Sequence, residues 1–256
     1  MDYTDSRIIF RLLKNPRESF RSIALDLDIS AQDMNYRIKK IKDEGIVKKY
    51  MLHVNPAIYG KNSLYLAFHN DEIYGGSVSS IIKCLEKIVV YGFSGSEDEI
   101  YEIKKDMIDS LGKPVMEYRP ATVTGNISAS ALDLQIINVL KNDPLKKSSD
   151  ISRMLDVKSA TVEKRIEKLK DSKLISIIPK LDLSKLNIVI LGIFTSKLET
   201  IQKELCESFL VINDRVSGIS LSIEKDIYSA NSKIQKMKKI DKNIETMIIY
   251  DYDFFE

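Results

Sequence analysis

The sequence predicts an α+β fold in which two winged helix-turn-helix domains alternate with two ferredoxin-like βαββαβ domains. Two observations lead to this prediction. The second half of the 256-residue chain repeats the first half. Each half begins with apolar residues at helical spacing and then changes to a pattern of strands that alternate with helices.

The repeat appears when the sequence is shifted by half its length, which aligns positions 5–47 with 133–175 without a gap. Most matched positions are apolar at helical spacing, so a shared fold explains them. The basic matches do not follow from the packing of a core. The identical charged pairs are Asp5/Asp133, Asp28/Asp156, Arg37/Arg165, Lys40/Lys168, Lys42/Lys170 and Asp43/Asp171.

The composition excludes several classes of protein. Hydrophobic residues make up 44% of the chain and charged residues 30%, as in ordinary globular domains. Two cysteines are too few for a disulfide framework. No apolar run reaches the ~18 residues of a membrane span, and the charged N-terminal segment lacks the apolar core of a signal peptide. We therefore expect a cytoplasmic protein.

The net charge of +2 by itself argues against a nucleic-acid binder. The charge is unevenly distributed, however: it is +3 for residues 1–60, −3 for 61–128, +4 for 129–187 and −2 for 188–256. The near-neutral total therefore hides two basic segments that alternate with two acidic ones. A basic segment is the electrostatic signature of a polyanion-binding surface.

The predicted domains follow the same alternation. The two winged helix-turn-helix domains are expected at 1–60 and 126–187, and the two ferredoxin-like domains at 61–125 and 188–256. The segment 121–130 is small, polar and uncharged, so it is the predicted linker between the halves.

Three helices and a wing are predicted in the first sixty residues. Asp5 is the expected cap of the first helix, which Asn15-Pro16 ends. Ser30 is well placed to cap the third helix, with Asp33 as a capping-box partner, and Gly45 to end it in a left-handed turn. Two short helices joined by a tight turn, the second one basic, are typical of a helix-turn-helix. The second helix is expected at 21–27, the turn at 28–30, the third helix at 31–44 and the wing, a hairpin, at 47–56.

The remainder of each half reads as strand–helix–strand–strand–helix–strand, which is the ferredoxin-like order. In the first half we expect strands at 63–70, 88–95, 96–100 and 114–120, with helices at 76–87 and 99–111. In the second half we expect strands at 187–196, 209–218, 219–226 and 244–255, with helices at 199–208 and 227–240.

The outer side of the predicted third helix has the side chains of a DNA-reading surface. A core stripe of Met34, Ile38 and Ile41 leaves amides, a hydroxyl and lysines facing outward. Amides and hydroxyls read base edges, and basic side chains neutralise phosphates. A solvated helix face has a similar pattern, but here helix, turn and wing occur in order and occur twice. The predicted phosphate contacts are Arg37, Lys39, Lys40, Lys48, Lys49, Lys164, Arg165, Lys168 and Lys180; the predicted base-reading residues are Gln32, Asn35, Tyr36, Ser159, Thr161 and Glu163; Ser30, Asp33 and Lys158 complete the predicted DNA-binding site.

The stretch ISAQDMNYRIKKIKDEGIVKKYMLHVNPAIYG (29–60) resembles the Lrp/AsnC family of bacterial and archaeal regulators. Residues 157–186 fit the same pattern, so the resemblance covers essentially the whole chain as two copies. It implies a winged helix-turn-helix joined to a ferredoxin-like effector domain, often called RAM. The residues that carry it in the first copy are Ser30, Met34, Arg37-Ile38, Ile41, Glu44-Gly45-Ile46-Val47, Asn55-Pro56 and Tyr59-Gly60.

The resemblance also implies a small-molecule effector such as an amino acid. The effector domain of the family usually shows a Gly followed closely by an Asp, and Ser94-Gly95 with Asp98 retain this pattern. The second half keeps Ser217-Gly218 without a following acid, which weakens the case for an amino-acid site there. The second copy also departs from the first by having Lys158 in place of Ser30 and Lys173 in place of Gly45.

The sequence contains no metal, cofactor or nucleophile motif. His53 and His69 do not have metal-ligand spacing to other ligands, and Cys84 and Cys206 fall on matching predicted helices, where packing is the expected role. We therefore expect no cofactor, no metal and no enzymatic activity. One alternative is a sirohaem decarboxylase, an activity of some Lrp/AsnC-like proteins, against which the scarcity of histidine argues. The other is a protein-interaction module that has lost DNA binding.

Together these features predict a sequence-specific DNA-binding transcription regulator. Members of the family usually dimerise through their effector domains and present two helix-turn-helix units to double-stranded DNA. A tandem chain builds this arrangement within one polypeptide, so the linker supplies an effective concentration and the target need not be palindromic. We predict a pseudo-dimer whose two ferredoxin-like units pack sheet against sheet, with a homodimer of the chain as the other possible self-association.

Overall fold

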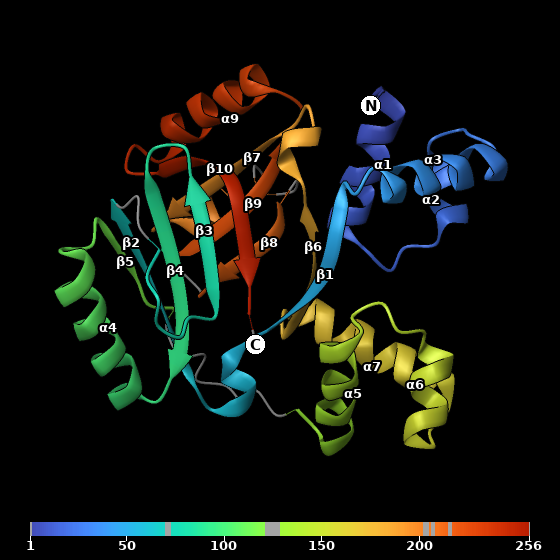
Figure 1. Ribbon diagram of the computed structural model, residues 1–256, viewed down its shortest axis with the longest axis horizontal. Helices are drawn as coiled ribbons and strands as arrows, with labels where there is room; N and C mark the ends of the chain where they lie inside the picture. The colour runs from blue at the N-terminus through green and yellow to red at the C-terminus, as the bar shows by residue number, and fades with distance from the viewer. Residues whose placement is uncertain are drawn as a thin grey trace.

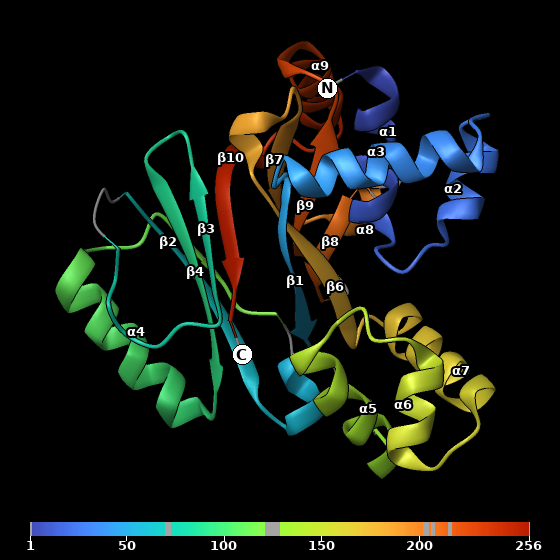
Figure 2. The ribbon, with the colours of Figure 1, turned by 45° about the vertical axis from the view of Figure 1, so that its right-hand side comes forward.

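Two three-helix units lie beside a large twisted sheet, as Figures 1 and 2 show. The computed structural model describes residues 2–69, 73–120, 129–201, 205, 208–214 and 217–255. The first unit consists of α1 (Tyr3–Lys14), α2 (Phe20–Asp26) and α3 (Ala31–Asp43), and the second of α5 (Ala131–Asn142), α6 (Ser148–Leu155) and α7 (Ser159–Asp171). The repeat in the sequence is therefore also a repeat in the structure.

Capping residues set the starts of the helices in the first unit. The hydroxyl of Ser30 accepts a hydrogen bond from the amide of Asp33 at 3.0 Å, as predicted. The predicted cap of α1 is wrong by one turn, because Asp2 is the N-cap and Asp5 is its partner in a capping box. In the turn between α2 and α3, Asp28 has a φ of +53°, and the corresponding Asp156 has a φ of +52°. Aspartate tolerates this left-handed conformation better than most residues.

Gly45 and Lys173 occupy the same left-handed position after α3 and α7, with φ of +64° and +55°. Glycine adopts this conformation freely, whereas a Cβ atom costs about 1–2 kcal/mol there. We therefore expect Lys173→Gly to raise the free energy of unfolding by about 1 kcal/mol, measured by urea denaturation. The matched control Gly45→Ala should lower it by a similar amount, since a Cβ at Gly45 would meet only Lys185 Nζ, at 3.6 Å. A Lys173→Gly protein no more stable than the wild type would refute strain at this position.

The predicted wing hairpins do not form. Residues 47–54 and 175–181 are instead the single strands β1 (Val47–Val54) and β6 (Ile175–Leu181), which pair with each other in an antiparallel two-stranded ribbon. The strands also exchange apolar side chains: Leu52 packs into the core of the second helical unit, and Ile178 packs into the core that contains the first. Each unit thus needs the strand of the other half to complete its core.

The larger sheet has the strand order β5-β2-β4-β3-β10-β7-β9-β8. Its first four strands come from the first half and its last four from the second, and each group has the 4-1-3-2 order of a ferredoxin-like unit. The predicted fold class is therefore confirmed. The strands are β2 (Asn62–His69), β3 (Ser80–Cys84), β4 (Ile88–Gly95), β5 (Met116–Tyr118), β7 (Val189–Thr195), β8 (Ser208–Asn213), β9 (Gly218–Glu224) and β10 (Glu245–Phe254).

Two further predictions for the first half are wrong. Residues 76–87 were expected to form a helix, but 80–84 are strand β3, in which buried and half-buried residues alternate. The apolar residues of this segment also fit a helical period. Pairing with β4 and β10 in the folded protein selects the strand over the helix. The expected strand at 96–100 is the start of helix α4 (Glu97–Leu111), because Ser96 and Glu99 form a capping box.

The second half follows its prediction more closely. Helix α9 (Ile227–Ile240) and strand β10 lie where they were expected. The helix predicted at 199–208 is described only as the short α8 (Leu198–Ile201), and residue 208 already belongs to β8. Most of the predicted linker, residues 121–128, lies outside the described residues.

The two ferredoxin-like units pack with their inner sheet faces together. Helix α4 covers the outer face of the first unit and α9 that of the second, while the inner faces share one apolar cluster. Across it, the rings of Tyr118 and Phe194 lie 5.4 Å apart. The predicted packing of one ferredoxin-like sheet against the other within the chain is therefore confirmed. In addition, the second part of β10 pairs with β3, which joins the sheets along one edge.

Two short 3-10 helices, η1 (Pro56–Tyr59) and η2 (Leu183–Lys185), follow the ribbon strands β1 and β6. Within the described parts of the chain, no helix has both the length and the apolar character that crossing a membrane requires.

Candidate nucleic-acid interface

The outer face of α3 presents the side chains that periodicity assigned to it. Gln32, Asn35, Tyr36 and Lys39 are exposed, and Tyr36 keeps 68% of its surface accessible. On the opposite face, the apolar stripe is buried in the core of the unit. Because α3 is the second helix of the helix-turn-helix, this face is the one that such a motif places in a DNA groove.

Arg37 lies on the side of α3 that faces α1. Its guanidinium donates to Asp2 and Asp5, each at 2.7 Å, and to Asp33 at 3.1 Å, and its side chain is only 18% exposed. Lys40 also reaches Asp5, at 3.2 Å. The paired carboxylates raise the pKa of Arg37 further above its ordinary value. Arg37 and Lys40, both predicted to contact DNA, thus already hold α3 against α1, and Asp33, also predicted to contact DNA, pairs with Arg37 within α3.

The second unit presents a different face. Ser159, Thr161 and Glu163 are exposed on α7, and so are the predicted phosphate contacts Lys164 and Lys168. Lys158 is the exposed N-cap residue of α7 and makes no side-chain capping bond. Arg165 repeats the role of Arg37 in weaker form, with one carboxylate, that of Asp133, at 3.2 Å.

The basic residues of the β1–β6 ribbon differ in their exposure. Lys48 and Lys49 stay about half exposed, and they form ion pairs with Asp182 at 3.6 Å and Asp253 at 2.9 Å. Lys180 is 6% exposed, so its predicted phosphate contact is wrong. Its ammonium group instead donates to Asp251, Asp253 and the carbonyl of Tyr252, all on strand β10.

The described histidines and the described cysteine lie in or at the ends of strands. His53 lies in β1 against the ring of Phe254, with ring centroids 5.6 Å apart, and burial lowers its pKa to about 4. His69 is exposed at the end of β2. Cys84 is buried on strand β3, not on the predicted helix, and burial raises the pKa of its thiol to about 12. Cys206 lies outside the described residues, among which no cluster of potential metal ligands occurs.

The predicted effector residues of the two halves lie at opposite ends of the equivalent strands β4 and β9. Ser94 and Gly95 end β4, and Asp98 is exposed in the first turn of α4. A Cβ at Gly95 would lie 2.8 Å from Oε2 of Glu99, so close packing of the helix start also requires glycine here.

Ser217 and Gly218, which the sequence matched to Ser94 and Gly95, lie instead at the start of β9. In the sheet, Gly218 pairs with the end of β7, whereas Gly95 pairs with the start of β2. Asp214 accepts hydrogen bonds from the amide of Ser217 at 2.7 Å and from its hydroxyl at 2.9 Å. This carboxylate precedes the Ser-Gly pair, and sequence reasoning missed it because it looked for an acid only after the glycine. The Ser217 carbonyl also accepts a hydrogen bond from the hydroxyl of Tyr118 in the first half, at 3.1 Å.

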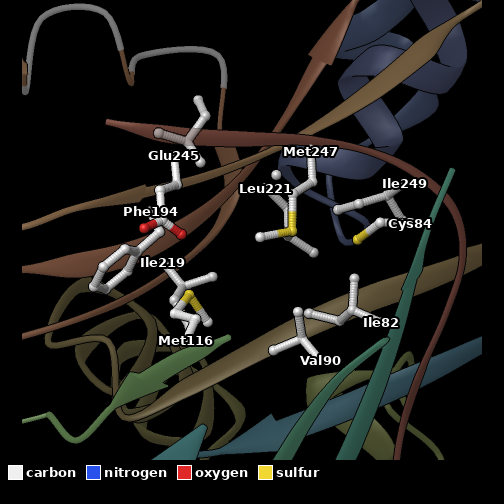
Figure 3. Close-up of a pocket in the computed structure, with 12 residues that line it drawn as sticks. Ile82, Cys84, Val90, Met116, Phe194, Ile219, Leu221, Glu245, Met247 and Ile249 are labelled. Atoms are coloured by element: carbon white, nitrogen blue, oxygen red, sulfur yellow. The ribbon is translucent and has the colours of Figure 1, made fainter. Parts of the chain in front are cut away.

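An apolar pocket lies between the two inner sheet faces (Figure 3). Ile82, Val90 and Met116 line it from the first half, and Leu221 and Met247 are among the residues that line it from the second. Glu245 is the one charged residue among its lining residues. The pocket therefore suits apolar atoms and offers no set of polar groups that would orient a substrate.

Comparison with known proteins gives matches to both halves. The family described as "Winged helix-turn-helix DNA-binding" matches residues 1–48 and 130–176. The chain is 32% identical to the HTH-type transcriptional regulator Ptr1 of Methanocaldococcus jannaschii over 124 residues, 46% of this chain and 80% of that protein. It is 29% identical to the HTH-type transcriptional regulator FL11 of Pyrococcus furiosus over 115 residues, 43% of this chain and 75% of that protein.

Two solved structures are similar at lower identity. The sirohaem decarboxylase NirDL is 12% identical, with a TM-score of 0.46, and the match covers 99% of this chain and 94% of that one. LrpC of Bacillus subtilis is 16% identical, with a TM-score of 0.35, and the match covers 51% of this chain and 99% of that one.

Proposed function

Because the chain belongs to the helix-turn-helix transcription regulators, we propose that it is one of the Lrp/AsnC type and binds specific double-stranded DNA as a pseudo-dimer within one polypeptide. The observation that carries this proposal is the pair of exposed polar helix faces, on α3 and α7, held in one molecule by the β1–β6 ribbon. We propose that the chain divides into four domains, with boundaries at residues 60, 125 and 187. The exchanged strands β1 and β6 connect the two helix-turn-helix domains.

The two helix faces favour an asymmetric target. Gln32 and Asn35 on α3 carry amides, which pair with adenine in the major groove, whereas Glu163 on α7 carries a carboxylate, which accepts from the amino group of cytosine. We propose that the two half-sites differ accordingly. The exposed lysines Lys39, Lys48, Lys49, Lys158, Lys164 and Lys168 are the proposed phosphate contacts, with Tyr36, Ser159 and Thr161 as further base contacts.

We also propose that the protein binds a small-molecule effector such as an amino acid. The loops at Ser94-Gly95-Asp98 and Ser217-Gly218 are the candidate sites, and the second has Asp214 as its carboxylate. A sirohaem-decarboxylase activity would need basic and histidine side chains around a tetrapyrrole. Among the described residues, neither His53 nor His69 lines the apolar pocket, so the geometry favours the regulator.

Selection of bound sequences from random duplex DNA tests this function. We expect an enriched two-part site whose affinity falls steeply with salt, because lysine–phosphate contacts release counterions. Asn35→Ala should cost about 1–3 kcal/mol of discrimination in one half-site and leave the other unchanged, and Thr161→Ala should do the reverse. Lys236→Ala, on the exposed face of α9 and away from both helix faces, is the matched control. Equal affinity for all duplexes, or a sirohaem absorbance spectrum after incubation with sirohaem, would contradict the proposal.

A further inference from the structure

The two helical units touch each other directly, apart from the ribbon that joins them. Arg17 lies in the loop between α1 and α2, and its guanidinium donates to the carbonyls of Pro144 at 3.0 Å and Lys146 at 2.8 Å. Both carbonyls belong to the loop between α5 and α6. In the same region, Lys170 of α7 donates to the side chain of Asn15 at 2.9 Å. Figures 1 and 2 show these two loops side by side.

This contact is partly removed from solvent. Arg17 is half-buried, and burial lowers its pKa. Burial and the nearby charge of Arg17 also lower the pKa of Lys170. The cost of desolvating two cations is offset here by hydrogen bonds to defined backbone and amide oxygens, so the pair holds only when the two units are correctly placed.

The contact does not obey the symmetry of the repeat. The residue that corresponds to Arg17 is Leu145, which packs against the core of the second unit, and the residue that corresponds to Lys170 is the exposed Lys42. A symmetric pair of units would make the contact twice or not at all. The two copies have therefore diverged so that each supplies one donor, Arg17 from the first half and Lys170 from the second, to an acceptor in the other half.

We propose that Arg17 and Lys170 form a clamp that fixes the spacing between the two DNA-reading helices α3 and α7. The first unit shares its core with the large sheet, whereas the core of the second unit consists of its own helices together with residues of and beside the ribbon. A second attachment at the helical loops therefore restricts twisting of the second unit about the ribbon. The chain then accepts one separation and one phase of its half-sites. This inference rests on the proposed DNA-binding function and adds to it the residues that set operator geometry.

The same contact reaches the reading face. Both Asp143 and Glu163 lie close enough to Arg17 to stabilise its charge, and Glu163 is a proposed base-reading residue. Lys170 lies one residue before the end of α7, so the clamp holds this helix near its C-terminal end. A small rotation of α7 about that contact would change which base pair its N-terminal half meets.

The test is a double variant, Arg17→Met/Lys170→Met, which keeps chain length and apolar volume but removes both donors. Lys42→Met is the matched control, because it removes the charge that corresponds to Lys170 at a position outside the contact. Affinity is measured on the selected two-part site and on sites with two or five base pairs inserted between the halves. A turn of B-DNA has about 10–10.5 base pairs, so these insertions rotate one half-site by roughly 70° and 170–180°.

We expect wild type and Lys42→Met to lose roughly tenfold or more in affinity with either insertion, and the double variant to lose no more than about threefold. A second measurement does not need DNA: it determines the distance between two spin labels, one attached at Arg21→Cys on α2 and one at Arg153→Cys on α6. The variant also carries Cys206→Ser, and Cys84 is buried, so that only the two introduced cysteines are labelled. The label distances should be narrowly distributed in the wild type and broad in the double variant.

The two readouts separate failure of the clamp from failure of the function. If the wild type binds no DNA at all, the proposed function falls, and the inference on operator spacing falls with it. If the wild type binds DNA but the double variant keeps the same spacing preference and the same narrow label distances, the clamp is refuted while the function stands. Circular dichroism of the double variant, expected to match that of the wild type, shows that the units remain folded.

Discussion

Replacing Asp5 by alanine is expected to lower the free energy of unfolding by about 3–5 kcal/mol. The Asp5 side chain is almost fully buried, and Arg37 and Lys40 both donate to it. Without it, Arg37 keeps only the more exposed carboxylates Asp2 and Asp33, in a position that is itself 18% exposed. Removal of one partner from a buried ion pair leaves a desolvated charge, and this is among the largest penalties a single substitution causes.

Urea denaturation measures this loss, with Asp33→Ala as the control. Asp33 also contacts Arg37, but it is 38% exposed, so its removal should cost no more than about 1 kcal/mol. A loss below 1 kcal/mol for Asp5→Ala would show that the network does not hold α1 against α3.

The pH dependence of the Asp5 network has a definite sign. Burial raises the pKa of Asp5, but hydrogen bonds from Arg37, from the backbone of Asp2 and from Lys40 outweigh it, so the pKa lies below its ordinary value. The carboxylate therefore contributes its full stability above about pH 4, and this contribution is lost as the pH falls through the lower folded-state value. The difference between wild type and Asp5→Ala should shrink correspondingly in acid.

This network also explains a feature of the repeat. Asp5/Asp133 and Arg37/Arg165 are identical pairs, and in each half the two residues form an ion pair. Sequence reasoning noted all four residues but assigned the arginines to DNA, because it had no partner for them within the fold. A contact of Arg37 with phosphate stays a prediction, and loss of affinity in Arg37→Ala must be compared with its loss of stability.

The helical units could be predicted from the sequence because their signals are local. The spacing of Met34, Ile38 and Ile41, the cap at Ser30 and the glycine at Gly45 all act within a few residues of each other. The base-reading face of α3 follows from the same period, and its residues are exposed as expected.

The strands were harder because their partners are distant in the sequence. Residues 47–54 were predicted to fold back on themselves, but their partner is residues 175–181 in the other half. Strand β3 was mistaken for a helix since its apolar residues fit either period, and only the neighbouring strands select one. Arg17 and Lys180 act through contacts about 130 and 70 residues away, which no local pattern reveals.

Replacing Lys180 by leucine, the residue that the first half has at the corresponding position 52, is expected to cost about 3–5 kcal/mol. The Lys180 ammonium group lies 2.5 Å from Asp251 and 2.8 Å from Asp253, and it also bonds the carbonyl of Tyr252. Burial raises the pKa of Asp253, but hydrogen bonds from Lys180 and Lys49 outweigh it, so the pKa of this carboxyl lies below its ordinary value. Leucine would leave the carboxylates with the partly exposed Lys49 and Lys83.

A matched set of variants separates charge from packing at this position. Lys49→Ala, which removes an exposed partner of Asp253, should cost no more than about 1 kcal/mol. Lys180→Leu/Asp251→Asn/Asp253→Asn should recover most of the loss, because an apolar residue is tolerated once no half-buried carboxylate faces it. If the triple variant is as unstable as Lys180→Leu, loss of packing and not of charge is responsible.

Since Lys180 joins the ribbon to strand β10, Lys180→Leu should also lower DNA affinity, because the helical units would be misplaced. The DNA affinity of the triple variant then tells whether the charges or the attachment itself orients the helical units.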